Sequence, residues 1–423
     1  MTLGVLLLAA AVSASAPDSI PRPITLEEAV SLAQANAPQV IQAQGQSRTS
    51  AAAVRSAYSA FIPSLNLSMR GSRQLPGGGA RPDTLPWSFS RGLVANVALF
   101  EGGKRFFDLR QAQARASAAG VNETIQQYAA SFNVKQQYFN VLAARESEGA
   151  ARAQLDQAQH QFKLSAAQLR AGIVTRSDSL RSEIQVRNAQ LALMEARTSV
   201  DVSNASLTRA VGTPNPVTAT ESDSTGDSEI KLSEQELRAL AESGPAVQQA
   251  RLSLQAARSA RQSAWTSYLP SLTATYAPSG NTGRPTFDPS GGYLYSGSVQ
   301  LALSMPLFDQ YKREEQVTQA RVAEQNAAAA LRDELLAAHE GLAQALGAYR
   351  SASERVATQI ATLAAAEEDL RLQQQRYNLG GSTLLDVLTS QTQLDQARSA
   401  LIRARYDRRV AKAQLEALVG RDL

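Results

Sequence analysis

The chain has 423 residues, of which 43% are hydrophobic but only 5% are aromatic, a composition that suits close-packed long helices better than one thick globular core. Its net charge of +4 is small and its bases are interleaved with acids, which argues against a nucleic-acid-binding surface. The absence of cysteine excludes disulfides, thiolate metal sites and a cysteine-linked lipid.

The sequence also lacks the residue sets that catalysis and cofactor binding need. The two histidines, His160 and His339, lie in separate helical patterns without partners at metal-ligand spacing. The run Gly102-Gly103-Lys104 lacks the upstream glycine and the following Ser or Thr of a phosphate-binding loop. We therefore expect no enzymatic activity, no cofactor and no metal site.

Residues 1–16 contain a short apolar run that ends in Ser-Ala-Ser-Ala, which is typical of a secretory signal peptide. The run is too short to span a bilayer, and no other apolar run reaches that length. If this protein enters a membrane, it must therefore do so with strands.

The elements of the first half follow in a clear order. Helical periodicity runs from Thr25 to about Ser59, and apolar residues then alternate with polar ones in two strands, around Leu65–Met69 and Phe89–Leu99. One very long helix is predicted from about Lys104 to Arg170, since this stretch has no proline. A glycine turn and a helix to Val211 complete the half.

The second half repeats this order after a polar stretch. The predicted elements are a helix at Leu232–Tyr268, strands around Leu272–Tyr276 and Val299–Met305, a long helix at Tyr311–Asn378, a glycine turn and a helix to Leu418. We interpret the chain as a tandem duplication, with a first repeat at 24–212, a polar linker or equatorial insert at 213–231, and a second repeat at 232–420.

The two glycine turns support this interpretation. In both, a glycine is followed by a Thr-x-x-Asp helix-start signal, and each residue of the first turn lies 208 positions before its counterpart. The matched residues are Gly172, Thr175 and Asp178 in the first turn, and Gly380, Thr383 and Asp386 in the second. Each turn is predicted to be the tip of an antiparallel helical hairpin.

The second long helix carries a heptad seam of alternating large and small apolar residues, which predicts close coiled-coil packing. Its members are Leu331, Leu335, Ala338, Leu342, Ala345, Tyr349, Ala352 and Val356.

Four strands cannot close a barrel, and open strand edges are not tolerated in lipid. The strands are therefore expected to be completed by other copies, which would give 8, 12 or 16 strands for two, three or four copies. Trp87, Tyr293 and Tyr295 near the loop ends are candidate interface aromatics. The alternative is the edge of a soluble sandwich.

The order of these pieces resembles the outer membrane efflux protein family, the TolC-like channels. The matching segments are T-L-E-E-A near the start, F-I-P-S-L and Y-L-P-S-L before the strands, A-L-F-E-G-G and P-L-F-D after them, and R-Y-N-L-G-G-S-T-L-L-D-V-L at the second tip. The resemblance implies a mainly α fold with a small β-barrel in the outer membrane, 12-stranded in a homotrimer, and a tunnel of coiled-coil hairpins across the periplasm. It also implies a passive conduit for tripartite efflux or type I secretion, whose tips dock a periplasmic adaptor fed by an inner-membrane pump.

The resemblance assigns roles to residues near the tips. Asp386 would line a pore constriction as an acidic ring that favours cations, with capping of its helix as the alternative. Asp178 is a second candidate for the constriction, but there capping alone is the favoured interpretation. Thr389 stands where channels with a double acidic ring carry a second aspartate. Tyr377 and Ser177 resemble members of a tip-closing network, but Ser382 replaces the arginine that some relatives use there. We therefore expect a weakly latched entrance.

Gly172 and Gly380 are expected to be turn glycines first and part of the adaptor-docking tips second. Two other classes stay open from the sequence. A soluble coiled-coil scaffold would leave the alternating segments as incidental loops, and a periplasmic adaptor would need compact β-domains around a single hairpin.

Overall fold

The computed structural model describes residues 21–72, 88–172, 174–220, 230, 232–282 and 294–421. The predicted signal peptide at 1–16, the aromatic residues Trp87 and Tyr293, and most of the predicted linker lie outside them. The chain divides into two compact units. The first unit comprises Met1–Ile41, Gln127–Glu234 and Gly341–Leu423, and the second comprises Gln42–Gln126 and Gln235–Glu340.

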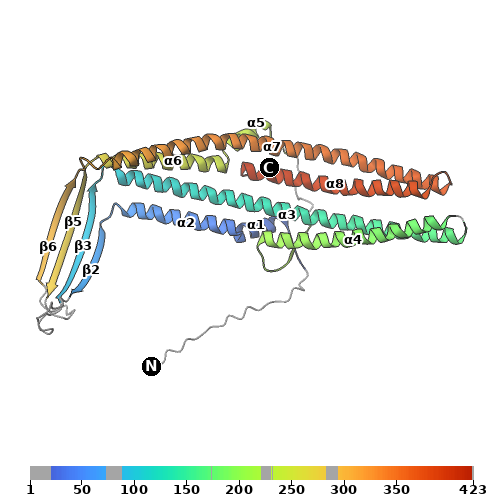
Figure 1. Cartoon of the computed structure of the whole chain (residues 1–423), viewed down its shortest axis with the longest axis horizontal. Coiled ribbons are helices and arrows are strands. Elements are labelled where there is room, and N and C mark those ends of the chain that lie inside the picture. The colour runs from blue at the N-terminus through green and yellow to red at the C-terminus, as the bar shows by residue number, and fades with distance from the viewer. Residues whose placement is uncertain are drawn as a thin grey trace, which may run out of the picture. The chain divides into compact units, whose positions relative to one another are not determined.

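Four long helices dominate the fold and confirm the sequence prediction. Helices α3 (Lys104–Arg170) and α7 (Lys312–Asn378) have 67 residues each, and α4 (Arg176–Val211) and α8 (Leu384–Val419) have 36 each. Figure 1 shows α4 folding back along α3, and α8 along α7. None of the described helices combines the length and apolarity needed to span a bilayer.

The heptad seam predicted for α7 lies on its buried side. Five of its eight members are buried: Ala338, Leu342, Ala345, Ala352 and Val356. The small residues among them let a neighbouring helix approach closely, as the pattern predicts.

Two predicted helices are each broken in two, which corrects the sequence analysis. The stretch from Thr25 to Ser59 forms α1 (Leu26–Asn36) and α2 (Pro38–Ser59), and the stretch from Leu232 to Tyr268 forms α5 (Glu234–Glu242), α6 (Pro245–Trp265) and a 3-10 turn. Pro38 and Pro245 cause the breaks. Proline has no amide hydrogen and its ring clashes with the preceding helical turn, so it ends one helix and begins the next.

The first unit contains a small parallel strand pair that the sequence analysis missed. Strand β1 (Arg22–Ile24) pairs with β4 (Val217–Ala219), so part of the predicted polar linker is ordered structure. The pair packs on α1, α3 and α4 around a hydrophobic core that includes Ile24, Val134, Tyr138, Val141, Leu207 and Val217. A three-residue strand is too short to show an alternating pattern.

Tyr138 of α3 ties this pair to the helices. Its side chain is fully buried, and its hydroxyl lies 2.6 Å from the carbonyl oxygen of Thr220 and 3.1 Å from that of Ile24. The amide of Thr220 also donates to the hydroxyl at 3.2 Å. Burial raises the pKa of this phenol, so it stays neutral and able to donate.

The second unit holds a four-stranded antiparallel sheet in the order β2-β3-β5-β6 (Figure 1). The strands are β2 (Ser64–Ser72), β3 (Ser88–Phe100), β5 (Ser271–Thr282) and β6 (Leu294–Ser304). The strands predicted from each half of the chain are therefore present, and β3 joins β5 to make one sheet. Tyr295 lies in β6.

The register gives this sheet two different faces. Residues directly opposite one another share a face, and the pairs Leu67–Leu93, Ala274–Leu301 and Leu272–Leu303 are all apolar. The opposite face carries mostly polar residues: Asn66, Ser68, Asn96, Thr273, Thr275 and Gln300. The apolar face stays exposed, since Leu65, Leu67, Val299, Leu301 and Leu303 are each more than half accessible to solvent.

An arginine clamp joins strand to helix in each half, and the sequence analysis did not identify it. Arg105 pairs with Glu101, lies over the ring of Phe61 and donates to the carbonyl of Leu99. Arg313 makes the same three contacts in the second half. It pairs with Asp309, lies over the ring of Tyr268 and donates to the carbonyl of Leu307. The clamp fixes where β3 or β6 ends and α3 or α7 begins.

Candidate functional site at the hairpin tips

The two hairpin tips have the same backbone. Gly172 has φ of 73° and Gly380 has φ of 77°, a left-handed conformation that residues with a side chain rarely adopt. A Cβ added at either glycine would meet no atom within 4 Å. The glycines are therefore required by the backbone turn and not by crowding.

The predicted capping boxes follow both glycines. At the second tip, the backbone amide and the hydroxyl of Thr383 each donate to Oδ2 of Asp386 at 2.8 Å, and the Asp386 amide donates back to the Thr383 hydroxyl at 3.3 Å. These hydrogen bonds lower the pKa of Asp386, with a smaller contribution from the positive charge of Arg376. Asp386 is exposed, so it is an ionised carboxylate at the helix start.

Asp178 occupies the matching place at the first tip. Its Oδ2 accepts from the amide and hydroxyl of Thr175 at 3.1 and 2.7 Å, and its Oδ1 lies 3.9 Å from Arg181. The hydroxyl bond from Thr175 is the main reason that the pKa of Asp178 is lowered. Both carboxylates therefore cap a helix, and only Asp178 faces an arginine on its own helix.

The remaining predicted tip residues are not joined to one another. The hydroxyl of Thr389 donates to the Leu385 carbonyl in its own helix at 2.8 Å, and Ser382 makes only a long contact to the next residue, Thr383. Ser177 is exposed in the first turn of α4. Within the described residues, no hydrogen bond links Ser177 or Ser382 to Tyr377, so a single chain shows no closed network at its tips.

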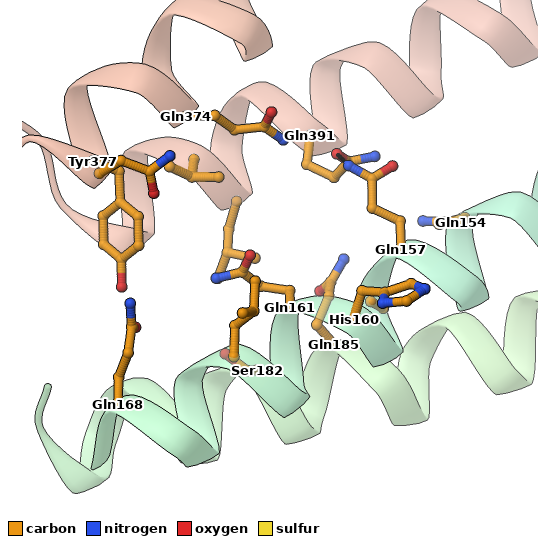
Figure 2. A pocket seen from close by; sticks show the side chains of 15 residues that line it. Gln154, Gln157, His160, Gln161, Gln168, Ser182, Gln185, Gln374, Tyr377 and Gln391 are labelled. Carbon is orange, nitrogen blue, oxygen red and sulfur yellow. Dashed lines mark hydrogen bonds between the residues drawn. The ribbon is translucent and has the colours of Figure 1, made fainter. Parts of the chain in front are cut away.

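Tyr377 lies near the end of α7 with its hydroxyl buried and without a hydrogen-bond partner in the described part of the chain. Burial raises its pKa, and the negative charge of Asp178 raises it further. Figure 2 shows the ring pointing toward Gln168 of α3, whose amide oxygen is also buried and unpaired. Tyr377 of the second hairpin therefore lies close enough to Asp178 of the first to be affected by its charge.

Beside Tyr377 lies a cavity of about 310 Å³ between the two hairpins of the first unit. Its wall is rich in amides, from Gln154, Gln157, Gln161, Gln168, Gln185, Gln374 and Gln391 (Figure 2). The sequence analysis missed this cavity. The glutamines of α3 at 154, 157, 161 and 168 follow helical spacing and could have indicated a polar stripe.

The cavity wall continues into a partly buried polar network. Gln157 of α3 donates to Gln391 of α8, and Gln391 donates to Asp395 at 3.1 Å. Burial is the largest influence on Asp395 and raises its pKa, because only part of its charge is compensated by Gln391 and Arg398. This network joins the hairpin of the first half to that of the second.

The structure offers no metal site among the residues it describes, where no group of three or more His, Asp or Glu side chains could hold an ion. His160 lies at the cavity wall, and His339 pairs with Glu242 at 2.8 Å.

Known proteins share this fold. The chain is 25% identical to protein CyaE of Bordetella pertussis over 391 residues, which covers 89% of this chain and 79% of the relative. Among solved structures, CusC superposes with a TM-score of 0.82 at 20% identity, covering 94% of this chain and 92% of CusC. The open state of the MtrE channel of Neisseria gonorrhoeae superposes with a TM-score of 0.78 at 20% identity, covering 94% of this chain and 89% of the MtrE chain.

The sequence model described as outer membrane efflux protein matches residues 29–213 and again 237–421. These two matches cover most of the chain and favour a channel over the scaffold and adaptor alternatives. The chain therefore belongs to the outer membrane efflux protein family, which confirms the predicted TolC-like resemblance and its location in the outer membrane.

Proposed function

We propose that this protein is the outer-membrane conduit of a tripartite efflux or type I secretion system. In this proposal a homotrimer carries substrates passively from a periplasmic adaptor and an inner-membrane pump to the exterior. The observation that carries it is the two-faced sheet of the second unit, which has one apolar face, one polar face and strands β2 and β6 at its edges.

An open sheet of this kind is unstable in lipid, because each unpaired backbone group there costs several kcal/mol. Pairing β6 of one copy with β2 of the next removes both edges. An eight-stranded barrel from two copies would be filled by its own side chains, whereas twelve strands from three copies leave room for a lumen. The polar face, where Thr275 donates to Asn96 at 2.8 Å, would line that lumen, and the apolar face would meet lipid.

The same proposal assigns the segments of the chain. Residues 1–16 serve as a signal peptide, 24–212 and 232–420 are the two repeats, and 213–231 form the equatorial insert between them. In the parallel pair, β1 precedes α4 in the sequence and β4 follows it. This pairing supports the view that the first part of the insert is ordered.

At the tips we assign the constriction to Asp386. Both of its capping contacts use Oδ2, so Oδ1 stays available to face a tunnel, and one carboxylate can cap its helix and join a ring of three. Asp178 has its second oxygen near Arg181 and contributes less. Thr389 adds no charge one turn on, so cation selectivity rests on a single ring.

The adaptor would dock at the tips that Gly172 and Gly380 shape. Tyr377, Ser382 and Ser177 would form the closing network in the trimer. Since Ser382 brings no positive charge, this entrance has no salt bridge at that position and opens more easily than one latched by arginine.

Cysteine crosslinking tests the trimer directly, because the chain has no cysteine of its own. Asn66→Cys on β2 is combined with cysteine at successive β6 positions, such as Ser298→Cys and Gln300→Cys. At least one pair is expected to give covalent dimers and trimers, but nothing larger, in the outer-membrane fraction.

The matched control is Thr275→Cys with Gln300→Cys. These residues are direct cross-strand neighbours in one chain, so this pair crosslinks without a change in mass. A water-soluble protein, or the absence of crosslinks between copies at every β6 position, contradicts the proposal.

A further inference from the structure

The turn that leads from the sheet into the long helix is strained in the second half of the chain only. In the first half it is made by Gly102 and Gly103, with φ of 61° and 87°. At the matching positions the second half has Gln310 and Tyr311, with φ of 61° and 64°. The left-handed region is costly for residues with a Cβ, so glycine would form this turn with less strain.

The strained residue displays an aromatic ring. Tyr311 is 70% exposed and stacks edge to face with Phe308, which is 73% exposed, at a centroid distance of 5.8 Å. Leu307 beside them is 88% exposed. We call Leu307, Phe308 and Tyr311 the aromatic turn. Its rings are held in place but are left uncovered, which is unusual for a surface that only meets water.

The lysine that follows this turn has an acidic partner in the first half but, among the described residues, not in the second. Lys104 in the first half pairs with Asp108 one turn on. Lys312 occupies the matching position, but Gln316 stands where the aspartate would be. Lys312 is exposed and has no acidic partner in the part of the chain that the structure describes. Its ammonium group is therefore available to an anion from outside the chain.

The aromatic turn follows directly after the strand whose apolar residues stay exposed. Leu301 and Leu303 lie on that face of β6, and Leu307 follows where the strand has ended and the helix has not yet begun. Tyrosine rings and lysine side chains at such a boundary fit the interface of a bilayer, where the ring lies at the level of the headgroups and the ammonium group reaches the phosphates.

We propose that the aromatic turn and Lys312 form a binding site for the phosphate headgroup of a membrane lipid, at the boundary between sheet and helices. This inference rests on the proposed function, because it needs the sheet to stand in lipid. In it, the lipid offsets the strain of Gln310 and Tyr311. A second copy of the chain is a competing occupant, because it too could cover the rings.

The test compares thermal midpoints of the detergent-solubilised protein with phosphatidylglycerol and with an uncharged diacylglycerol of the same chains. Wild type is expected to be stabilised more by phosphatidylglycerol, and Lys312→Gln is expected to lose this difference. Lys104→Gln is the matched control and should keep it, because Lys104 is paired within the chain.

Tyr311→Gly separates a lipid role from a structural one. It should raise the midpoint in lipid-free detergent, because strain is relieved, and should reduce the response to phosphatidylglycerol. A second copy as occupant would instead make Tyr311→Gly lose trimers without any lipid effect. If wild type crosslinks as a membrane trimer but Lys312→Gln responds to lipid like wild type, the headgroup site is wrong and the proposed function stands. A water-soluble wild type overturns both.

Discussion

Tyr138→Phe probes how the first unit is held together. The substitution keeps the buried ring in the core and removes only the hydroxyl, which lies 2.6 Å from the Thr220 carbonyl. The Thr220 amide keeps a second partner, because it also donates to the Ile24 carbonyl at 3.1 Å. The main loss is therefore one donor to the partly buried carbonyl oxygen of Thr220, since the Ile24 carbonyl keeps the Thr220 amide as its donor.

Losing one hydrogen bond of this kind costs about 0.5 to 1.5 kcal/mol. A cost near 1.4 kcal/mol corresponds to about a tenfold larger equilibrium constant for local opening. The effect should be local, because the hydroxyl contacts only the ends of β1 and β4.

Hydrogen exchange measured by mass spectrometry on the protein in detergent is the direct assay. Peptides that contain Val217–Thr220 are expected to exchange about tenfold faster in Tyr138→Phe, while peptides of α8 keep their rate. Tyr128→Phe on the same helix is the matched control, since this tyrosine is only half-buried. Unchanged exchange at Val217–Thr220 would refute the role given to Tyr138.

Three further predictions concern the tips and the network behind them. Asp386→Asn should weaken both cation selectivity and the block caused by divalent ions in single-channel recordings, while trimers persist. Unchanged selectivity would contradict the acidic ring. Gly380→Val should abolish export with trimers intact, because a β-branched residue is strained at φ of 77°, whereas Gly380→Asn should retain part of it; full export by the valine variant contradicts the docking assignment. The raised pKa of Asp395 means that the folded chain binds this proton more tightly than the unfolded chain, so stability falls as pH rises from the ordinary carboxyl pKa of 3.8 through the folded value. Asp395→Asn should flatten that fall and raise the thermal midpoint at pH 7. If the midpoint of Asp395→Asn at pH 7 instead lies below that of the wild type, the fold favours the charged carboxylate and the prediction is wrong.

The long helices could be predicted because their signals are local. An uninterrupted run without proline leads to a glycine, and a Thr-x-x-Asp signal restarts the next helix, so Gly380, Thr383 and Asp386 sufficed to place the second tip. The breaks at Pro38 and Pro245 were also local. They were missed because the helical periodicity continues on both sides of each proline.

Other features depend on residues far apart in the chain. The strands β1 and β4 have three residues each and are stabilised by Tyr138, which is 82 residues from Thr220. The amide-lined cavity needs glutamines from both hairpins, and no pattern within one helix shows that they meet. Such contacts come from tertiary packing, which local propensity does not encode.

The two halves of the chain share their backbone geometry but differ in the side chains at several matching positions. Helix lengths, tip glycines, capping boxes and arginine clamps are the same in both. Two of the contacts that changed lie at the junction of sheet and helix, where Tyr311 replaces Gly103 and Gln316 replaces the Asp108 partner of the lysine. A trimer built from such chains would alternate relaxed and strained junctions around its circumference. The first-half junction forms this turn with glycine, so the cost of holding Gln310 and Tyr311 in the second must be offset by other contacts. The stacking of Tyr311 on Phe308 within the chain is one such contact, and the lipid of our proposal would be another.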